Sequence, residues 1–189
     1  MKNQEPLWKN TDKIDNFIGI ASDFDLVYVV GGHGRTFVLL LTFTKCILLS
    51  SDSLICALIQ YIAMWDLTHN PSSQKLLAEF FEAGKYVAAV CHGPGALLHV
   101  TLSNGELLIK DQPVTGFSNL EEQMIELDKF MPYALETELV KGGGKYEKAD
   151  APWGAHVSVG RGGRLITGQN PASAAGVAEA FLNHHRGEK

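Results

Sequence analysis

Short apolar runs alternate along this chain with segments whose apolar residues recur at helical spacing. Unbroken apolar runs predict buried strands, and apolar residues at every third or fourth position predict amphipathic helices. The runs that predict strands are 25–30, 86–90, 156–159 and 165–167, with a small hairpin over 107–109 and 114–115. The segments that predict helices are 74–83, a short turn around 97–98, 121–127, 134–141 and a last helix that opens at 170–171. This alternation predicts a single α/β domain over 1–189, with a mostly parallel sheet and helices on both faces.

The most informative segment joins one of these strands to a helix start. The strand over 86–90 runs directly into Cys91 and His92, and Gly93 and Pro94 follow. Glycine suits a tight bend, and proline suits the first turn of a helix. A thiol at a helix N-terminus lies in a positive field that favours the nucleophilic thiolate, and an adjacent imidazole can exchange protons with the group attacked. We therefore predict that Cys91 is a nucleophile and His92 its acid–base partner. The alternative is a structural cysteine beside a surface histidine.

A second turn is expected at the same edge of the sheet. Gly31 and Gly32 follow the strand over 25–30, and the carboxyl ends of parallel strands share one edge. Because glycine has no Cβ, the backbone N–H groups here can approach a ligand and stabilise an oxyanion. His33 and Gly93 complete this candidate oxyanion and substrate-binding set. The alternative for the glycine pair is a plain turn.

Composition and charge exclude several classes of function. The net charge of −5 gives no electrostatic basis for binding nucleic acid or an anionic membrane. The three cysteines have no metal-ligand spacing, and their odd number argues against a disulfide framework. We therefore expect neither a metal nor a cofactor. A working thiol and the polar residues 1–10, which do not read as a secretory signal, predict a cytoplasmic location, with the nucleus as an alternative.

Five segments occur in an order that resembles the PfpI-like superfamily, which is class I glutamine amidotransferase-like. These segments are Val29–Gly34, Met64–Leu67, Ala89–Pro94, Thr115–Asn119 and Leu165–Pro171. Within the superfamily the chain is most similar to the branch of heat-shock-chaperone-type glutathione-independent glyoxalases and deglycases. The resemblance implies a flavodoxin-like three-layer sandwich, usually a homodimer.

The same resemblance implies site residues. Cys91 matches the nucleophile and His92 its partner, and a carboxylate after the Thr-Gly-Phe segment orients the histidine. Glu122 matches this carboxylate, with Glu121 as the alternative. An imidazole needs such an acceptor to fix its tautomer and to stabilise its cationic form. The other interpretation of the two glutamates is that they are first-turn acids that offset a helix dipole.

The chain departs from the family pattern in two places. Relatives begin with a strand, a helix and a further strand, and the turn after the first strand supplies a glutamate that contacts the cysteine. Here the strand over 25–30 follows a polar N-terminal segment, so we expect the first strand-helix-strand to be missing and assign the glutamate's role to no residue. The second departure is an apolar insert at 35–63. Three interpretations compete for it: a translated intron, a helical insertion on the surface, or a membrane span, which the charged and polar residues within it interrupt.

The resemblance implies a reaction for this site. Cys91 would attack the aldehyde of methylglyoxal or glyoxal, and His92 would relay a proton through an enediol until water releases D-lactate. This is glyoxalase III (D-lactate dehydratase) chemistry, a lyase activity in stress response and reactive-carbonyl detoxification that requires neither metal nor glutathione. The alternatives are a holding chaperone that binds unfolded client proteins, a redox sensor that uses the same thiol, and a cysteine amidase or peptidase.

Overall fold

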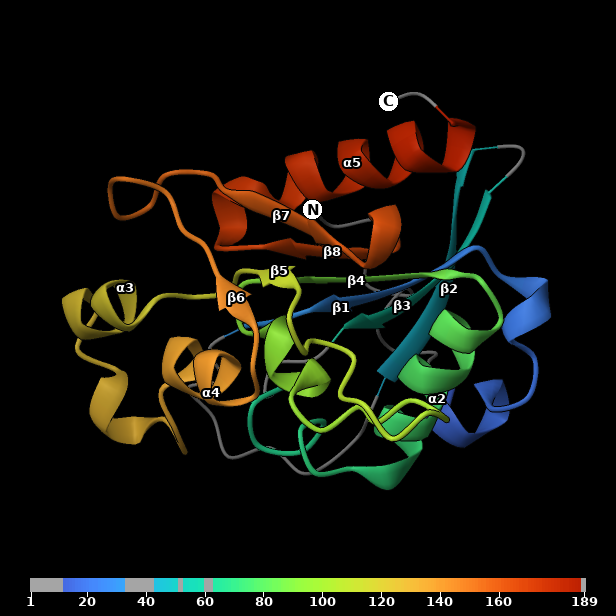
Figure 1. The fold of residues 1–189 in the computed structure, drawn as a ribbon, viewed down its shortest axis with the longest axis horizontal. Coiled ribbons are helices and arrows are strands. Elements are labelled where there is room, and N and C mark those ends of the chain that lie inside the picture. Colours follow the sequence, from blue (N-terminus) through green and yellow to red (C-terminus); the bar gives the residue numbers. More distant parts are fainter. Residues whose placement is uncertain (1–11, 33–42, 51–52, 60–62, 188–189) are drawn as a thin grey trace, which may run out of the picture.

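The computed structural model describes residues 12–32, 43–50, 53–59 and 63–187, with the backbone alone described for 43–50 and 53–59 (Figure 1). A sheet of six strands forms its centre. The strands are β1 (Leu26–Val30), β2 (Phe43–Ser50), β3 (Ser53–Ile59), β4 (Tyr86–Val90), β7 (Val157–Gly160) and β8 (Leu165–Gly168). The α-helices are α2 (Pro71–Glu82), α3 (Asn119–Met124), α4 (Leu135–Lys141) and α5 (Ala174–Arg186). Short 3-10 helices include η3 (Gly93–Leu97), directly after β4, and η6 (Pro171–Ser173), directly before α5.

The strands stand in the order β2-β3-β1-β4-β8-β7. The four inner strands β3, β1, β4 and β8 are mutually parallel, and β2 and β7 are antiparallel at the two edges. The apolar runs that predicted β1, β4 and β8 are mostly buried, as expected for strands with helices on both faces. The prediction of an α/β fold with a mostly parallel sheet is therefore confirmed.

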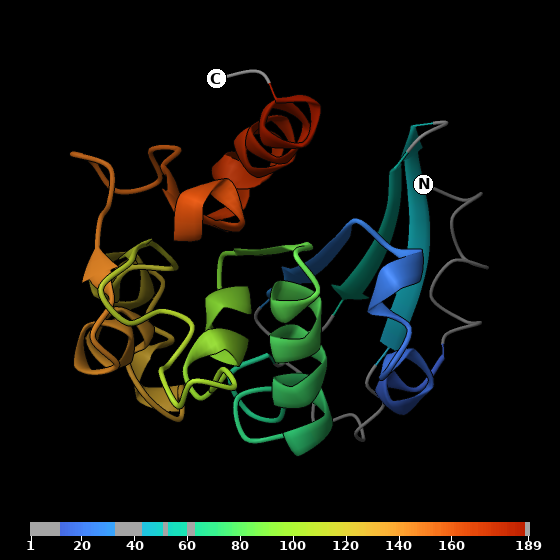
Figure 2. The ribbon, with the colours of Figure 1, turned by 45° about the vertical axis from the view of Figure 1, so that its right-hand side comes forward.

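Helices cover both faces of the sheet and make three layers (Figures 1 and 2). On one face α2 buries Leu76, Leu77 and Phe80 completely. This helix begins at the Asn70 cap, whose side chain accepts a hydrogen bond from the backbone N–H of Ser73. On the other face α5 packs Val177 and Phe181 against apolar side chains of the sheet, which are Leu26, Ala88 and Ile166.

The insert at 35–63 forms strands where the structure describes it. Residues 43–50 and 53–59 make an antiparallel hairpin, and β3 pairs in parallel with β1 from Leu26↔Ile55 to Val30↔Ile59. The interpretation of this segment as a helical insertion is therefore wrong for these residues. Backbone pairing explains the outcome: β1 presents an open row of N–H and C=O groups, and an apolar segment of strand length satisfies them. The expected gap beside β1 is filled from within the chain. Among the described residues, no helix is long and apolar enough to cross a membrane.

The expected hairpin over 107–109 and 114–115 is also wrong. Leu107 forms an isolated bridge with Thr101, and Pro113–Val114 (β5) pairs in parallel with Lys145–Tyr146 (β6). The partner strand is therefore about thirty residues away. A glycine turn after α4 brings it back, with Gly143 at φ +85°, a conformation that side chains with a Cβ rarely adopt.

Two turns at the carboxyl ends of β1 and β4 meet through their backbones. A Cβ added at Gly31 would overlap the backbone nitrogens of His92 and Gly93, and one added at Gly93 would overlap the carbonyl oxygen of Val29. No flexible side chain lies between them. The absence of a Cβ at both positions allows the turn after β1 to lie directly against the turn that carries Cys91.

We predict that Gly31→Ala destabilises the fold by at least about 3 kcal/mol, because backbone atoms cannot move aside as a side chain tip can. Gly105→Ala is the matched control: Gly105 has φ +82° but no atom within 4 Å of an added Cβ. It should cost only the strain of a left-handed residue, about 1–2 kcal/mol. Urea unfolding of both variants measures the difference, and equal losses would contradict the close contact.

Candidate active site

Cys91 occupies a sharp elbow between β4 and η3. Its φ is +63°, uncommon for a residue with a side chain, and such strain persists only where the surroundings hold it. The N–H of Cys91 donates to the carbonyl of Gly168 (3.0 Å), and its carbonyl accepts from the N–H of Phe117 (2.8 Å). Contacts from two other segments therefore hold the elbow. The predicted strand-turn-helix geometry is present, with a short 3-10 helix in place of an α-helix.

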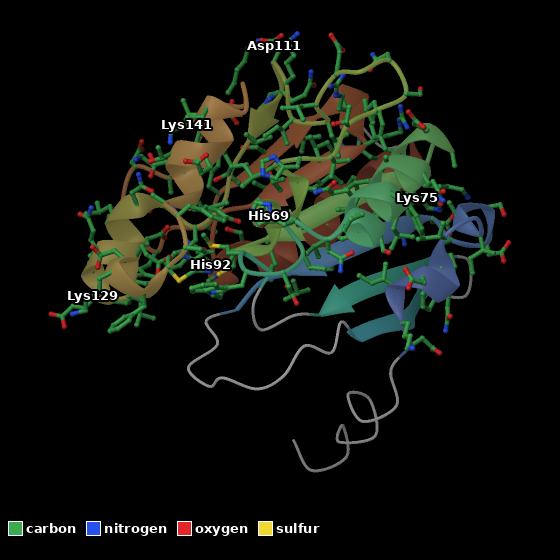
Figure 3. All side chains as sticks on the ribbon, turned by 90° about the horizontal axis from the view of Figure 1, so that it is seen from below. His69, Lys75, His92, Asp111, Lys129 and Lys141 are labelled. Carbon is green, nitrogen blue, oxygen red and sulfur yellow. The ribbon has the colours of Figure 1, made fainter. Side chains whose placement is uncertain are left out.

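The side chains of Cys91, His92 and Glu122 form a continuous line of contacts. The thiol sulfur lies 3.2 Å from Nδ1 of His92, and Nε2 of the same ring lies 2.6 Å from Oε2 of Glu122. An ionised carboxylate can only accept, so Nε2 carries a proton and Nδ1 is left with a lone pair facing the thiol. The imidazole is 1% exposed and the cysteine 4%, so water hardly reaches this line. Figure 3 marks His92 among the surrounding side chains.

The structure separates the two candidate glutamates. A capping box begins α3: the Ser118 hydroxyl accepts from the N–H of Glu121, and Glu121 Oε2 accepts from the N–H of Ser118. Neighbouring residues in a helix point about 100° apart. Glu121 therefore turns back into the interior, and Glu122 reaches the imidazole. The geometry assigns the histidine-orienting contact to Glu122.

Two aromatic rings extend from His92 toward the surface. The Phe117 ring centroid lies 4.5 Å from that of His92, and Trp153 meets Phe117 edge-on at 5.6 Å. Trp153 is 42% exposed. Neither ring was predicted from the sequence to lie beside His92. The local signal that could have indicated Phe117 is an aromatic residue just before the Ser118 cap.

The charge state of Cys91 differs from the sequence expectation. Burial raises the pKa of the thiol to about 12; a hydrogen bond from the backbone N–H of His92 lowers it, while the carboxylates of Glu122 and Glu121 raise it further. The five-residue η3 does not offset the loss of hydration. At neutral pH the resting residue is a thiol, not the expected thiolate. Its proton has a nearby acceptor in His92 Nδ1.

The predicted oxyanion residues have different surroundings. The N–H of Gly31 donates to the carbonyl of Val90 (3.1 Å), so it is not available to a ligand, and this part of the prediction is corrected. Gly32 follows it and is partly buried; His33 lies outside the described residues. Gly93 is buried against β1. The backbone N–H that does face the sulfur is that of His92.

The structure also bears on the remaining histidines and on metal binding. The rings of His69 and His99 stack on each other with their centroids 5.2 Å apart. Within the described residues, no group of three or more side chains of the metal-ligating types is gathered closely enough to hold an ion.

The raised pKa predicts how alkylation of Cys91 depends on pH. Between pH 7 and 10 the rate with iodoacetamide should increase about tenfold per pH unit without a plateau, because the thiolate fraction grows throughout this range. Mass spectrometry of the Cys91 peptide measures the rate, and the urea-unfolded chain, with an ordinary thiol pKa of 9.0, is the control. A plateau at or below pH 9 in the native protein would contradict the prediction.

The raised pKa also makes the stability of the protein depend on pH. The native state binds the thiol proton more tightly than the unfolded chain does, which adds to the free energy of unfolding. This addition is complete below pH 9.0 and is lost as the pH rises toward 12.

Comparison with known proteins names several glutathione-independent glyoxalases as relatives. A protein of Schizosaccharomyces pombe named a probable glutathione-independent glyoxalase, hsp3104, is 28% identical over 181 residues, which are 93% of this chain and 68% of the relative. The glutathione-independent glyoxalase HSP31 of Saccharomyces cerevisiae is 32% identical over 61% of this chain and 50% of its own length. The chain thus spans only about half the length of several curated relatives it matches. No family model matches the chain.

Solved structures agree with these relatives. Glyoxalase III from Candida albicans is 29% identical with a TM-score of 0.59, covering 64% of this chain and 52% of that chain. A two-domain protein from Anabaena variabilis with a DJ-1/ThiJ/PfpI-like domain shares the fold: it is 23% identical, with a TM-score of 0.50, over 89% of this chain and 33% of that one. The chain is therefore similar to the Hsp31-type glutathione-independent glyoxalases, and its fold is that of the DJ-1/ThiJ/PfpI-like proteins.

Proposed function

We propose that this chain is a glutathione-independent glyoxalase that converts methylglyoxal to D-lactate through Cys91. The observation that carries the proposal is the buried line from the Cys91 sulfur through both nitrogens of His92 to Glu122. The names of the relatives support the same activity, although several of them extend well beyond the part that this chain matches. Assignment to the lyases, as a D-lactate dehydratase, is part of the proposal.

The first step is addition of the thiol to the aldehyde. A carbon–sulfur bond forms while the thiol proton passes to Nδ1 of His92, so the thiolate need not exist before substrate arrives. Glu122 stabilises the imidazolium that results. The aldehyde oxygen becomes an oxyanion, which the backbone N–H of His92 is placed to meet, and then takes the proton back to give a hemithioacetal.

The second step moves hydrogen within the substrate. His92 Nδ1 removes the proton from the former aldehyde carbon, giving an enediolate, and returns it to the neighbouring carbon, while the hydroxyl proton of the hemithioacetal moves from the first oxygen to the second. The first carbon is thereby oxidised to a thioester and the second reduced to an alcohol, so no external oxidant or reductant is needed. Water then cleaves the carbon–sulfur bond, releasing lactate and restoring the thiol.

The alternatives make different demands on the same residues. A redox-sensing cysteine is typically exposed with a lowered pKa, whereas Cys91 is buried with a raised pKa, so the geometry does not favour this role. A holding chaperone would use exposed apolar surface and would not need Cys91. Amidase or peptidase chemistry would need the same thiol and imidazole with an acyl substrate. Homodimer formation and a cytoplasmic location stay predictions.

We predict that the purified chain forms D-lactate from methylglyoxal without glutathione, and that Cys91→Ala abolishes turnover because the bond-forming atom is lost. Glu122→Gln should lower kcat by about 10- to 100-fold, the usual cost of losing a partner that orients a histidine. Enzymatic assay of D-lactate measures both.

The control separates catalysis from chaperone action. Suppression of client aggregation is followed by light scattering with the parent and with Cys91→Ala. Equal methylglyoxal turnover by the two proteins would contradict the proposal, and suppression that survives the substitution without any turnover in the parent would favour the chaperone.

A further inference from the structure

Glu121 is a fully buried acid that takes no part in the proposed proton relay. Its Oε2 accepts from the N–H of Ser118 (3.0 Å) and from the hydroxyl of Ser118 (2.7 Å). Its Oε1 accepts from the N–H of Trp153 (3.0 Å) and from Nδ2 of Asn170 (2.8 Å). Four donors thus converge on one carboxylate with 0% exposure. A buried charge is tolerated only with such compensation, so these bonds define its position closely.

The donors come from three segments that are far apart in the sequence. Ser118 caps α3, Trp153 lies in the loop between β6 and β7, and Asn170 follows β8. Asn170 Nδ2 also donates to the carbonyl of Gly154 (2.8 Å), and Gln169 Oε1 accepts from the N–H of Ala149 (2.8 Å). The Gly168–Pro171 segment, which the reaction does not use directly, therefore fastens the loop around Glu121.

The carboxylate is held in its charged form. Burial raises the pKa of Glu121, but hydrogen bonds from the side chains of Gln169 and Asn170 and from Ser118 outweigh burial, so the pKa lies below its ordinary value. The charged form is the one that can accept all of these bonds.

The hydrogen bonds around Glu121 support two contacts of the His92 imidazole, one with Glu122 and one with Phe117. On one side Glu122, the next residue along α3, lies 2.6 Å from His92 Nε2. A helix of six residues has little stability of its own, so its orientation comes from its contacts. On the other side the loop bonded to Glu121 carries Trp153, whose ring packs on Phe117, and Phe117 packs on His92.

We propose that Glu121 is a positioning residue that holds the Glu122 carboxylate and the rings of Phe117 and Trp153 against His92. It acts through the two supports of the imidazole, which are Glu122 and the Phe117–Trp153 pair. The inference rests on the proposed function for its effect on turnover, while the positioning itself is a property of the hydrogen bonds.

The test is a double-substitution cycle with Glu121→Gln and Glu122→Gln. A glutamine at 121 would replace one accepting oxygen by an NH₂ group, which cannot accept the hydrogen bonds now made to that oxygen. The kcat for methylglyoxal should therefore fall about tenfold or more. In the Glu122→Gln background the same change should cost a smaller factor, because only the Phe117–Trp153 support then remains to be lost. Equal fold-losses in the two backgrounds would overturn the proposal.

Two further variants keep the result interpretable. If Glu121→Gln does not fold, Ser118→Ala takes its place, because it removes only one donor to Oε2. It should lower kcat by a smaller factor, and that factor should again be smaller when Glu122 is already replaced by Gln. Glu136→Gln is the matched control: Glu136 also accepts from the first turn of α3, at the N–H of Asn119 (2.8 Å), but its partner in the β6–β7 loop is the exposed side chain of Lys148 and not the backbone of Trp153. It should leave kcat within twofold. A loss equal to that of Glu121→Gln would mean general loosening of α3 and overturn the proposal.

Proton NMR supplies a readout that does not require turnover. The short hydrogen bond between His92 and Glu122 should give a low-field imidazole proton signal in the parent, absent from Glu122→Gln. We expect Glu121→Gln to lose or shift it and Glu136→Gln to retain it. Loss in Glu121→Gln from a parent that does not turn over methylglyoxal would support positioning while the proposed function fails. An unchanged signal, or no signal in the parent, would overturn positioning.

Discussion

The close backbone contact between the turn after β1 and the turn after β4 is the constraint on which the site depends. Parallel pairing of these strands brings both turns to one edge of the sheet, and the glycines at 31 and 93 let the two backbones lie against each other. Cys91 is then held in a left-handed conformation by bonds from β8 and from the segment before α3. These contacts aim the thiol at the imidazole that follows it. The site is thus a consequence of sheet order and not of any one loop.

Burial gives this thiol an unusual balance between reactivity and protection. An exposed thiolate would be strong enough to attack an aldehyde unaided, but it would also be open to oxidation. The protonated thiol of Cys91 avoids that exposure and needs a base at the moment of attack. His92, fixed by Glu122, is placed to supply it. Reactivity then depends on substrate being present, which suits an enzyme for reactive carbonyl compounds.

The two adjacent glutamates at the start of α3 make different contacts. The helical step sends Glu121 into a cage of donors and Glu122 toward the imidazole. An acid that closes a capping box usually stabilises its own helix end. Here the same acid also binds a distant loop and the segment after β8, so local helix capping and the arrangement of the site are one set of hydrogen bonds.

The sequence by itself determined the α/β class, the position of β4, the elbow at Cys91–His92 and the pair of glutamates that contained the orienting acid. The first three follow from local patterns: apolar runs, helical spacing, and glycine and proline at turns. The pair of glutamates follows from the family resemblance. The tertiary structure alone decided which glutamate meets His92, because that depends on how α3 is anchored. It also decided the charge state of Cys91, since burial by distant residues outweighs the local field of a short helix. The sequence also did not predict β3, the strand that pairs with β1. A short apolar segment can form a helix or a strand, depending on what it packs against. The open edge of β1 that selects the strand exists only in the folded structure.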